Sequence, residues 1–311
     1  MKTVACRAIT THWLRACMVV LGLVAAVGVA QAQANAGNDV NGAAEALHAR
    51  HAALKDKLAD NAFRRPLVLE STEEAGDLKG DIYAVVEHPY ATVRTALGRA
   101  ASWCDILILH LNIKSCRAAE AADRSKPATV TVNVGKKYDQ PIEQTYEVAF
   151  DYRVAAQSAD YLQVRLNAEN GPLGTKDYRI VLEAVPLEAG RSFIHLAYSY
   201  AYGFAARVAM KGYLATIGSG KVGFSVAGKD PDGKPQYVGG VRGVVERNTM
   251  RYYLAIDAYL DSLGAPKGEQ QEKRLHDWFA ATESYATQLH ELSADEYLTM
   301  KRSELKRQAE R

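Results

Sequence analysis

Two cysteines with a histidine between them form the stretch of this chain richest in possible chemistry. The stretch "SWCDILILHLNIKSC" ends at Cys116 and holds an apolar run around His110. A structural zinc site needs four ligands, and neither a further pair of cysteines nor a pair of histidines accompanies these residues. The close Cys-x-x-Cys spacing of redox dithiols is also absent. We therefore predict a structural disulfide between Cys104 and Cys116, a bond that persists in oxidising compartments.

The N-terminus predicts export to such a compartment. Lys2, Arg7 and Arg15 precede an uncharged apolar run that ends in "AQA", a suitable cleavage site. We expect residues 1–32 to be a signal peptide and the mature protein to be soluble and periplasmic. Cleavage removes those three positive charges and no acid, which takes the formal charge from +2 to −1. A nearly neutral chain has no general attraction to nucleic acid.

His110 permits two interpretations. A histidine in an apolar run can act as an acid or base with a displaced pKa. More often it is a core residue whose hydrogen bonds are satisfied, and we favour that interpretation. We assign no catalytic residue, no metal ligand and no cofactor.

A tyrosine-rich segment, "RSFIHLAYSYAYG", is a second candidate site. Strand alternation places Tyr198, Tyr200 and Tyr202 on one face and His195 on the other. Tyrosine joins an apolar ring to a polar tip, which suits a pocket for an amphipathic ligand. His195 would belong to such a pocket only if its own face were the concave one. Ordinary half-buried sheet residues would produce the same pattern.

Polar residues interrupt the apolar pattern of a helix predicted over residues 242–264. Arg247 and Arg251 are four residues apart and share one helix face, while Asn248 lies closer to the apolar stripe. On an inner face, the arginines would bind a carboxylate or an anionic headgroup. On an outer face, they would pair with acids or meet solvent.

The elements that position these residues follow a distinctive order. A helical pattern over residues 43–63 precedes a strand at 81–87 and a helix over 88–104. Short turn-like separators between the next strands indicate an antiparallel meander. These strands are predicted at residues 128–135, 144–156, 160–169, 177–185 and 191–203. A short helix over 204–218 and a hairpin between 221 and 241 precede the long helix.

This order resembles the helix-grip superfamily, which includes the START (StAR-related lipid-transfer) domains and the polyketide cyclase-like proteins. The resemblance covers about residues 80–264. It implies an α+β fold in which a curved antiparallel sheet wraps around a long C-terminal helix and leaves a cavity. Residues 33–79, a leader and an N-terminal helix, and residues 265–311, a C-terminal helical extension, fall outside it. In the extension, Ser293 and Glu296 resemble a capping box that begins a helix.

The resemblance implies binding or transfer of a hydrophobic or amphipathic small molecule, a lipid in particular, between sheet and helix. The residues expected to contact the ligand are Tyr198, Tyr200, Tyr202, His195, Arg247, Asn248 and Tyr252. A polyketide cyclase-like enzyme is one alternative. Another is a ligand-free envelope assembly factor with an exposed apolar patch around Trp278, Phe279 and Tyr285. The C-terminal helices would then contact an envelope protein or, transiently, a membrane surface.

Overall fold

The computed structural model describes residues 39–74, 76–121, 123, 126–203, 212 and 220–310. The signal peptide expected over residues 1–32 lies outside these residues, as does the helix expected over 204–218 apart from residue 212. None of the helices within the described ranges has the length and apolarity needed to cross a membrane.

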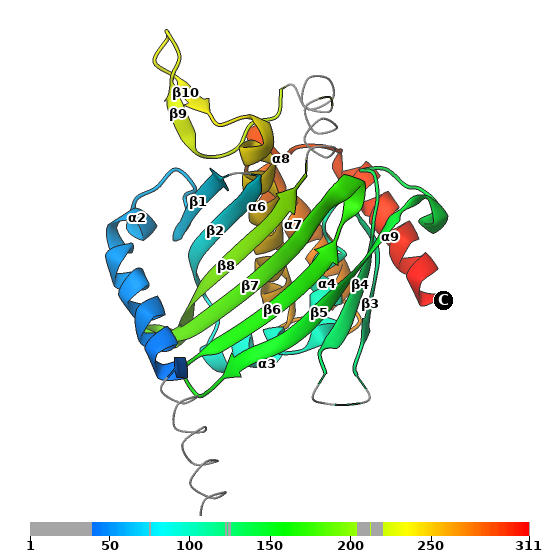
Figure 1. Cartoon of the computed structure of the whole chain (residues 1–311), viewed down its shortest axis with the longest axis horizontal. Coiled ribbons are helices and arrows are strands. Elements are labelled where there is room, and N and C mark those ends of the chain that lie inside the picture. The colour runs from blue at the N-terminus through cyan, green and yellow to red at the C-terminus, as the bar shows by residue number, and fades with distance from the viewer. Residues whose placement is uncertain are drawn as a thin grey trace, which may run out of the picture.

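One eight-stranded antiparallel sheet dominates the structure (Figure 1). Its strands are β1 Leu67–Glu74, β2 Asp77–Val86, β3 Ile113–Ala119, β4 Ala128–Val134, β5 Tyr146–Gln157, β6 Leu162–Asn170, β7 Thr175–Leu187 and β8 Arg191–Tyr202. The spatial order β1-β2-β8-β7-β6-β5-β4-β3 shows that the meander from β3 to β8 returns the chain to the first hairpin. The sheet thus begins at Leu67, upstream of the expected start at residue 80.

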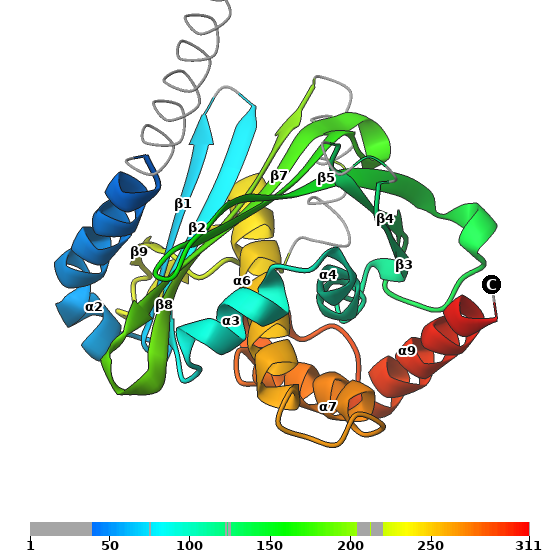
Figure 2. The ribbon, with the colours of Figure 1, turned by 90° about the horizontal axis from the view of Figure 1, so that it is seen from below.

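The concave face of the sheet holds a long helix (Figure 2). This helix, α6 Gly240–Ser262, lies with α3 Tyr90–Leu97 and α4 Ala100–Leu107 on the inner side of the sheet. The strand register aligns inward-facing apolar residues, because Leu196 of β8 lies between Ile82 of β2 and Leu182 of β7. All three are fully buried in one core with α6. This arrangement is the α+β helix-grip fold predicted from the order of elements.

The N-terminal helix covers part of the convex face. Helical residues 39–53 continue into α2 Lys55–Ala59. A second apolar core forms where Leu47, Leu54 and Leu58 of this segment pack with Val185 and Phe193 of the sheet. Residues 39–42, expected in a flexible leader, already belong to this helix.

The C-terminal extension folds into three helices: α7 Gln270–Glu283, α8 Ala286–Leu289 and α9 Ala294–Ala309. A capping box between Ser293 and Glu296 begins α9, as predicted. The assembly-factor alternative predicts an exposed apolar patch on this extension, but Trp278 is only 1% exposed and stacks on Tyr297 of α9 at 5.1 Å. Phe279 stacks on the same ring.

Two smaller features complete the fold. The predicted disulfide joins Cys104, in α4, to Cys116, in β3. The predicted hairpin forms as β9 Val226–Lys229 and β10 Pro235–Tyr237, a separate two-stranded sheet above α6 (Figure 1).

Candidate functional site

A cavity of about 130 Å³ lies between the sheet and helix α6. Its walls are mainly apolar and come from α4 and from strands β3, β4, β5 and β7. The apolar lining residues include Leu107, Ile113, Val132, Val148, Phe150 and Ile180. Strand alternation explains this wall, since Val148 and Phe150 face inward on β5 while Ala149 between them is exposed.

Tyrosines supply the polar tips of the cavity. Tyr198 of β8 and Tyr252 of α6 both line it, and their rings meet edge-on with centroids 5.1 Å apart. Tyr178 of β7 lines it as well, with its centroid 6.3 Å from that of Tyr198. The Tyr178 hydroxyl donates to Thr175 Oγ1 at 2.8 Å. Tyr178 was not predicted from the sequence, although it lies two residues from Ile180 and thus on the same strand face.

The other two predicted tyrosines lie beside the cavity and are not part of its wall. Tyr200 is buried on the concave face, where it stacks on Tyr178 with centroids 5.2 Å apart. Tyr202 ends β8, and its hydroxyl donates to Glu73 at 3.0 Å. Only Tyr198 of the three therefore contacts the cavity directly.

The lining tyrosines are protonated at neutral pH, since the usual pKa of a phenol is about 10 and burial raises it. Burial raises the pKa of Tyr198 well above its usual value, and the neighbouring Tyr252 raises it further. Burial likewise raises the pKa of Tyr252. A phenol with a raised pKa retains its proton and can donate a hydrogen bond.

His110 lies in the loop between α4 and β3 and lines the cavity. Its side chain is buried, and its ring stacks on Tyr252 with centroids 5.1 Å apart. The backbone N–H of Asn112 donates to His110 Nδ1 at 3.1 Å, while Nε2 has no hydrogen-bond partner among the described residues. The prediction of a core histidine whose hydrogen bonds are satisfied is therefore only half correct. The residue is buried, but its Nε2 makes no hydrogen bond of good geometry to the described residues.

Burial lowers the pKa of His110 well below its usual value. Positive charges near the ring lower the pKa further, and they belong to Arg251, Lys301 and Lys137. The imidazole is consequently neutral at neutral pH.

The predicted polar residues of α6 separate into two groups. Asn248 lines the cavity, and its side chain interacts with both Tyr198 and His110. Arg247 is buried away from the cavity wall, and its Nη1 donates to the carbonyl of Val222 at 3.0 Å. The expectation that Arg247 contacts the ligand is not met, because its guanidinium holds the loop before α6.

His195 faces the opposite side of the sheet, so its predicted place in the pocket is wrong. Its Nδ1 lies 2.7 Å from Glu183 and its Nε2 lies 2.8 Å from Asp81. The ring also stacks on Tyr83 at 4.4 Å. The alternation of β8 was read correctly, but the tyrosine face is the concave one.

Among the described residues, the ionisable groups that line the cavity are tyrosines and one histidine. No carboxylate occurs among the described residues that line it, and its histidine is neutral with a strongly lowered pKa. Within the described ranges, no group of three or more His, Cys, Asp or Glu side chains could hold a metal ion. The arrangement offers hydrogen-bond donors on an apolar wall, which is suited to binding.

Comparisons with known proteins show only distant similarity. Neither a protein-family model nor a curated protein sequence matches the chain significantly. Similar solved structures include a START superfamily protein from Mycobacterium smegmatis, with 11% identity, a TM-score of 0.31 and coverage of 44% of this chain and 91% of that chain. Human StAR-related lipid transfer protein 5 shares 8% identity with a TM-score of 0.30, covering 57% of this chain and 89% of that one. Norcoclaurine synthase from Thalictrum flavum shares 12%, with a TM-score of 0.32 and coverage of 48% and 87%. Sequence identities this low do not indicate a function, so the function has to be inferred from the cavity of this chain.

Proposed function

We propose that this protein binds a hydrophobic or amphipathic small molecule in the cavity between the sheet and α6. The carrying observation is the cavity itself, whose apolar wall meets a cluster of His110, Tyr198, Asn248 and Tyr252. Burial of apolar surface would supply most of the affinity, and the polar cluster would fix the orientation of the ligand. Sequestration or transfer of the ligand follows as the mode of action.

The cavity volume limits the part of the ligand that can enter. A protein cavity of roughly 150 Å³ holds one benzene molecule, and this one measures about 130 Å³. The volume therefore matches a single ring or a chain of about six carbons. A lipid, the ligand class expected from the sequence, would insert only the end of a chain unless the cavity enlarged.

The proposed site of action is the periplasm. The charged and apolar N-terminal residues support export, as does the disulfide between Cys104 and Cys116. The mature chain would begin at Gln33 and keep only this pair of cysteines.

Native mass spectrometry tests location and binding in one sample. The protein would be released from the periplasm of its host by osmotic shock, measured intact, then denatured and extracted. We expect the mass of a chain that begins at Gln33 with one disulfide, carrying a small-molecule adduct. Recovery only with the cytoplasmic fraction would contradict the location. A protein that is purified without a ligand and that binds none of a panel of small hydrophobic compounds would contradict the binding function.

A further inference from the structure

The unpartnered nitrogen of His110 indicates what kind of polar group the ligand carries. Because Nδ1 accepts the N–H of Asn112, this nitrogen carries no proton. The single proton of the neutral ring is therefore on Nε2, which makes no hydrogen bond of good geometry to the described residues, although the side chain of Asn248 lies beside the ring. A buried N–H without an acceptor is costly, so the ligand would have to supply an oxygen or other acceptor here.

The neighbouring polar groups are donors of the same kind. The hydroxyls of Tyr198 and Tyr252 are protonated at neutral pH, since the usual pKa of a phenol is about 10 and burial raises the pKa of both residues further. The amide of Asn248 lines the cavity beside them and carries both a donor and an acceptor. Donors from three elements thus converge on one region, where a ligand oxygen would accept several hydrogen bonds.

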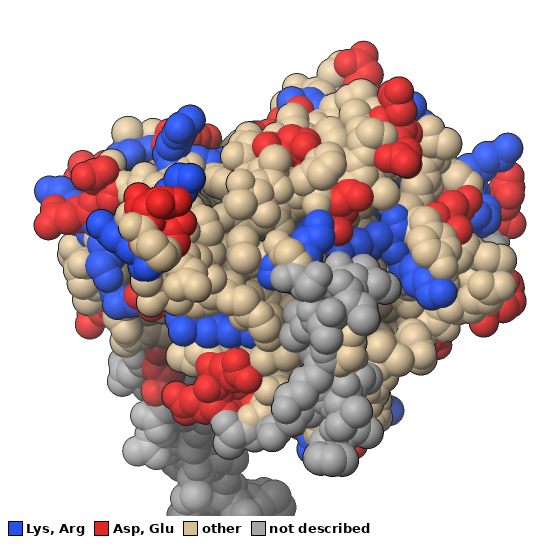
Figure 3. Space-filling model, turned by 90° about the horizontal axis from the view of Figure 1, so that it is seen from above, with Lys and Arg blue, Asp and Glu red and all other residues tan. Residues whose placement is uncertain are grey.

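Positive charge is in excess near this region. Glu291 forms ion pairs with Lys137 at 2.6 Å, with Arg251 at 3.0 Å and with Lys221 at 3.2 Å. Among the described residues, these three cations therefore share one carboxylate. Lysine and arginine side chains gather near the middle of the upper face of the molecule (Figure 3). Arg251 follows Asn248 by less than one turn of α6, which places this charge close to the cavity.

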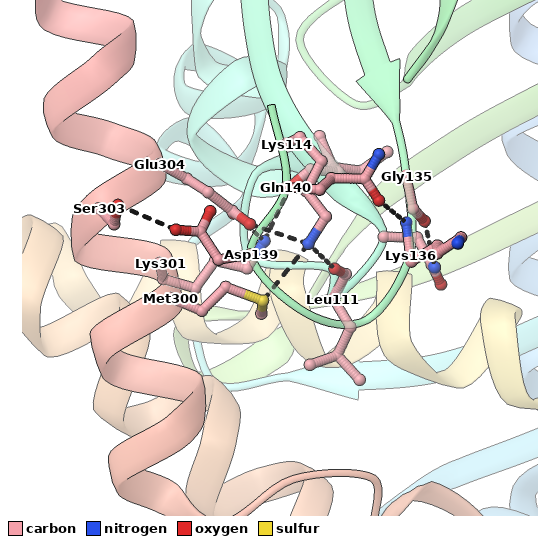
Figure 4. Close-up of polar contacts among 12 residues, drawn as sticks. Leu111, Lys114, Gly135, Lys136, Asp139, Gln140, Met300, Lys301, Ser303 and Glu304 are labelled. Carbon is pink, nitrogen blue, oxygen red and sulfur yellow. Dashed lines mark hydrogen bonds and ion pairs between the residues drawn. The ribbon is translucent and has the colours of Figure 1, made fainter. Parts of the chain in front are cut away.

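A second surplus of positive charge lies under the loop of His110. Lys114 and Lys301 are completely buried and both pair with Glu304 at 2.8 Å. Figure 4 shows the Lys114 ammonium pointing toward Glu304 and toward the carbonyl of Leu111 in this loop. Lys301 donates to the carbonyl of His110 itself at 2.8 Å.

We propose that the cavity selects small molecules that carry a carboxylate, whose oxygen accepts the hydrogen bond of His110 Nε2. This inference rests on the proposed binding function and specifies its ligand class. A neutral oxygen would use the donors but gain little from the surrounding cations. A ligand cation would face both the donors and the excess positive charge, so the cavity disfavours it.

Four probes of equal ring size test the inference at pH 7: toluene, benzyl alcohol, benzoate and benzylamine. We expect saturable binding of toluene, tighter binding of benzyl alcohol and benzoate binding at least about tenfold tighter than toluene. Benzylamine, a cation at this pH, binds weakest. Isothermal titration and amide chemical shifts give the affinities and the location.

Variants assign the preference to His110. His110→Phe should lower the affinity for benzoate by roughly tenfold or more and change that for toluene by less than about threefold. The control His276→Phe changes an exposed histidine of α7 and should leave both affinities unchanged. If His110→Phe does not fold, the ¹⁵N imidazole signals of the wild-type protein test the role of His110 instead. Benzoate should then shift the Nε2 signal of His110.

The outcomes separate this inference from the proposed function. Toluene binding without a preference for benzoate, or benzoate binding that leaves the His110 signals unchanged, overturns the inference and retains the binding function. Preference for benzylamine also overturns it. Failure of all four probes to bind overturns the proposed function together with the inference.

Discussion

His195 lies between two carboxylates on the convex face of the sheet. Its ring bridges Asp81 and Glu183, and the Tyr161 hydroxyl donates to the same Glu183. Burial alone would lower the pKa of His195, but the hydrogen bonds to the two carboxylates outweigh it and raise the pKa. Glu183 responds in the opposite sense: burial would raise its pKa, yet its hydrogen bonds lower it to about 2. The three groups therefore favour an imidazolium between two carboxylates.

Replacement of His195 by glutamine should show a defined pH dependence. Because the folded-state pKa of His195 is raised, its stabilisation is fully present below the unfolded pKa of about 6.5 and is lost as pH rises through the folded value. We expect His195→Gln to lower the free energy of unfolding by about 2 kcal/mol at pH 5.5 and by less at pH 9. Urea unfolding at both pH values measures this.

The exposed His276 provides the matched control, since His276→Gln should have little effect at either pH. A difference between wild type and His195→Gln that did not change with pH would show that the ring acts only by packing.

Single residues also show where sequence reasoning failed. Alternation in β8 assigned Tyr198 and His195 correctly to opposite faces, but it carries no information on which face is concave. His110 was recognisable as buried, yet its unsatisfied nitrogen depends on the loop geometry that directs the Asn112 N–H to Nδ1. Tyr178 could be identified as a lining residue only from the strand register, which sets Ile180 opposite Tyr198 and so aligns the two strands at the cavity.

Helix α9 is the element that supports the cavity from outside the sheet. The hydroxyl of Tyr297 donates to the carbonyl of Leu109 at 3.0 Å, and Lys301 donates to the carbonyls of His110 and Ile113 at 2.8 Å. These bonds hold the loop that carries His110. The C-terminal extension therefore positions a cavity residue, a role that its place outside the helix-grip core did not suggest.

Removal of the Glu304 carboxylate tests this docking. Glu304→Ala leaves the ammonium groups of Lys114 and Lys301 buried without their counter-ion, which should lower the free energy of unfolding by about 3–5 kcal/mol. Glu310→Ala removes an exposed carboxylate near the end of the same helix and should change it by less than about 0.5 kcal/mol. Denaturant titrations compare the two, and equal effects would show that α9 does not depend on the buried ion pairs.

Some limits of the helices were predictable, but their docking was not. The single helix predicted over residues 88–104 is wrong, because the chain breaks at Gly98 and Arg99 into α3 and α4. Apolar periodicity predicted the helix over residues 242–264, and α6 spans Gly240–Ser262. The capping box predicted the start of α9. Lys114 and Lys301 gave no sign of burial, because isolated lysines usually lie in solvent and only the folded chain brings them to Glu304.

At the scale of the whole molecule, one sheet separates two environments. The concave face holds α6, the main core and the cavity, while the convex face carries the N-terminal helix and the His195 cluster (Figure 2). Element order was enough to predict this helix-grip architecture, because it resembles the order of the helix-grip superfamily, which implies a curved sheet around the last helix. The size of the cavity depends on how the side chains of the sheet and the helix fill the space between them. The pattern of apolar residues in the sequence does not predict this packing.

Blocking the cavity is the most direct test of the central claim that it binds a small hydrophobic ligand. Val148→Phe would place a ring in the cavity from β5, whereas Ala149→Phe adds the same ring on the opposite, exposed face of the strand. Toluene is the probe, and amide chemical shifts report its binding. We predict saturable shifts around Val148 and Tyr198 in the wild type, the same shifts in Ala149→Phe, and their loss in Val148→Phe with the fold retained. No saturable shift in the wild type, or undiminished binding by Val148→Phe, would contradict the claim.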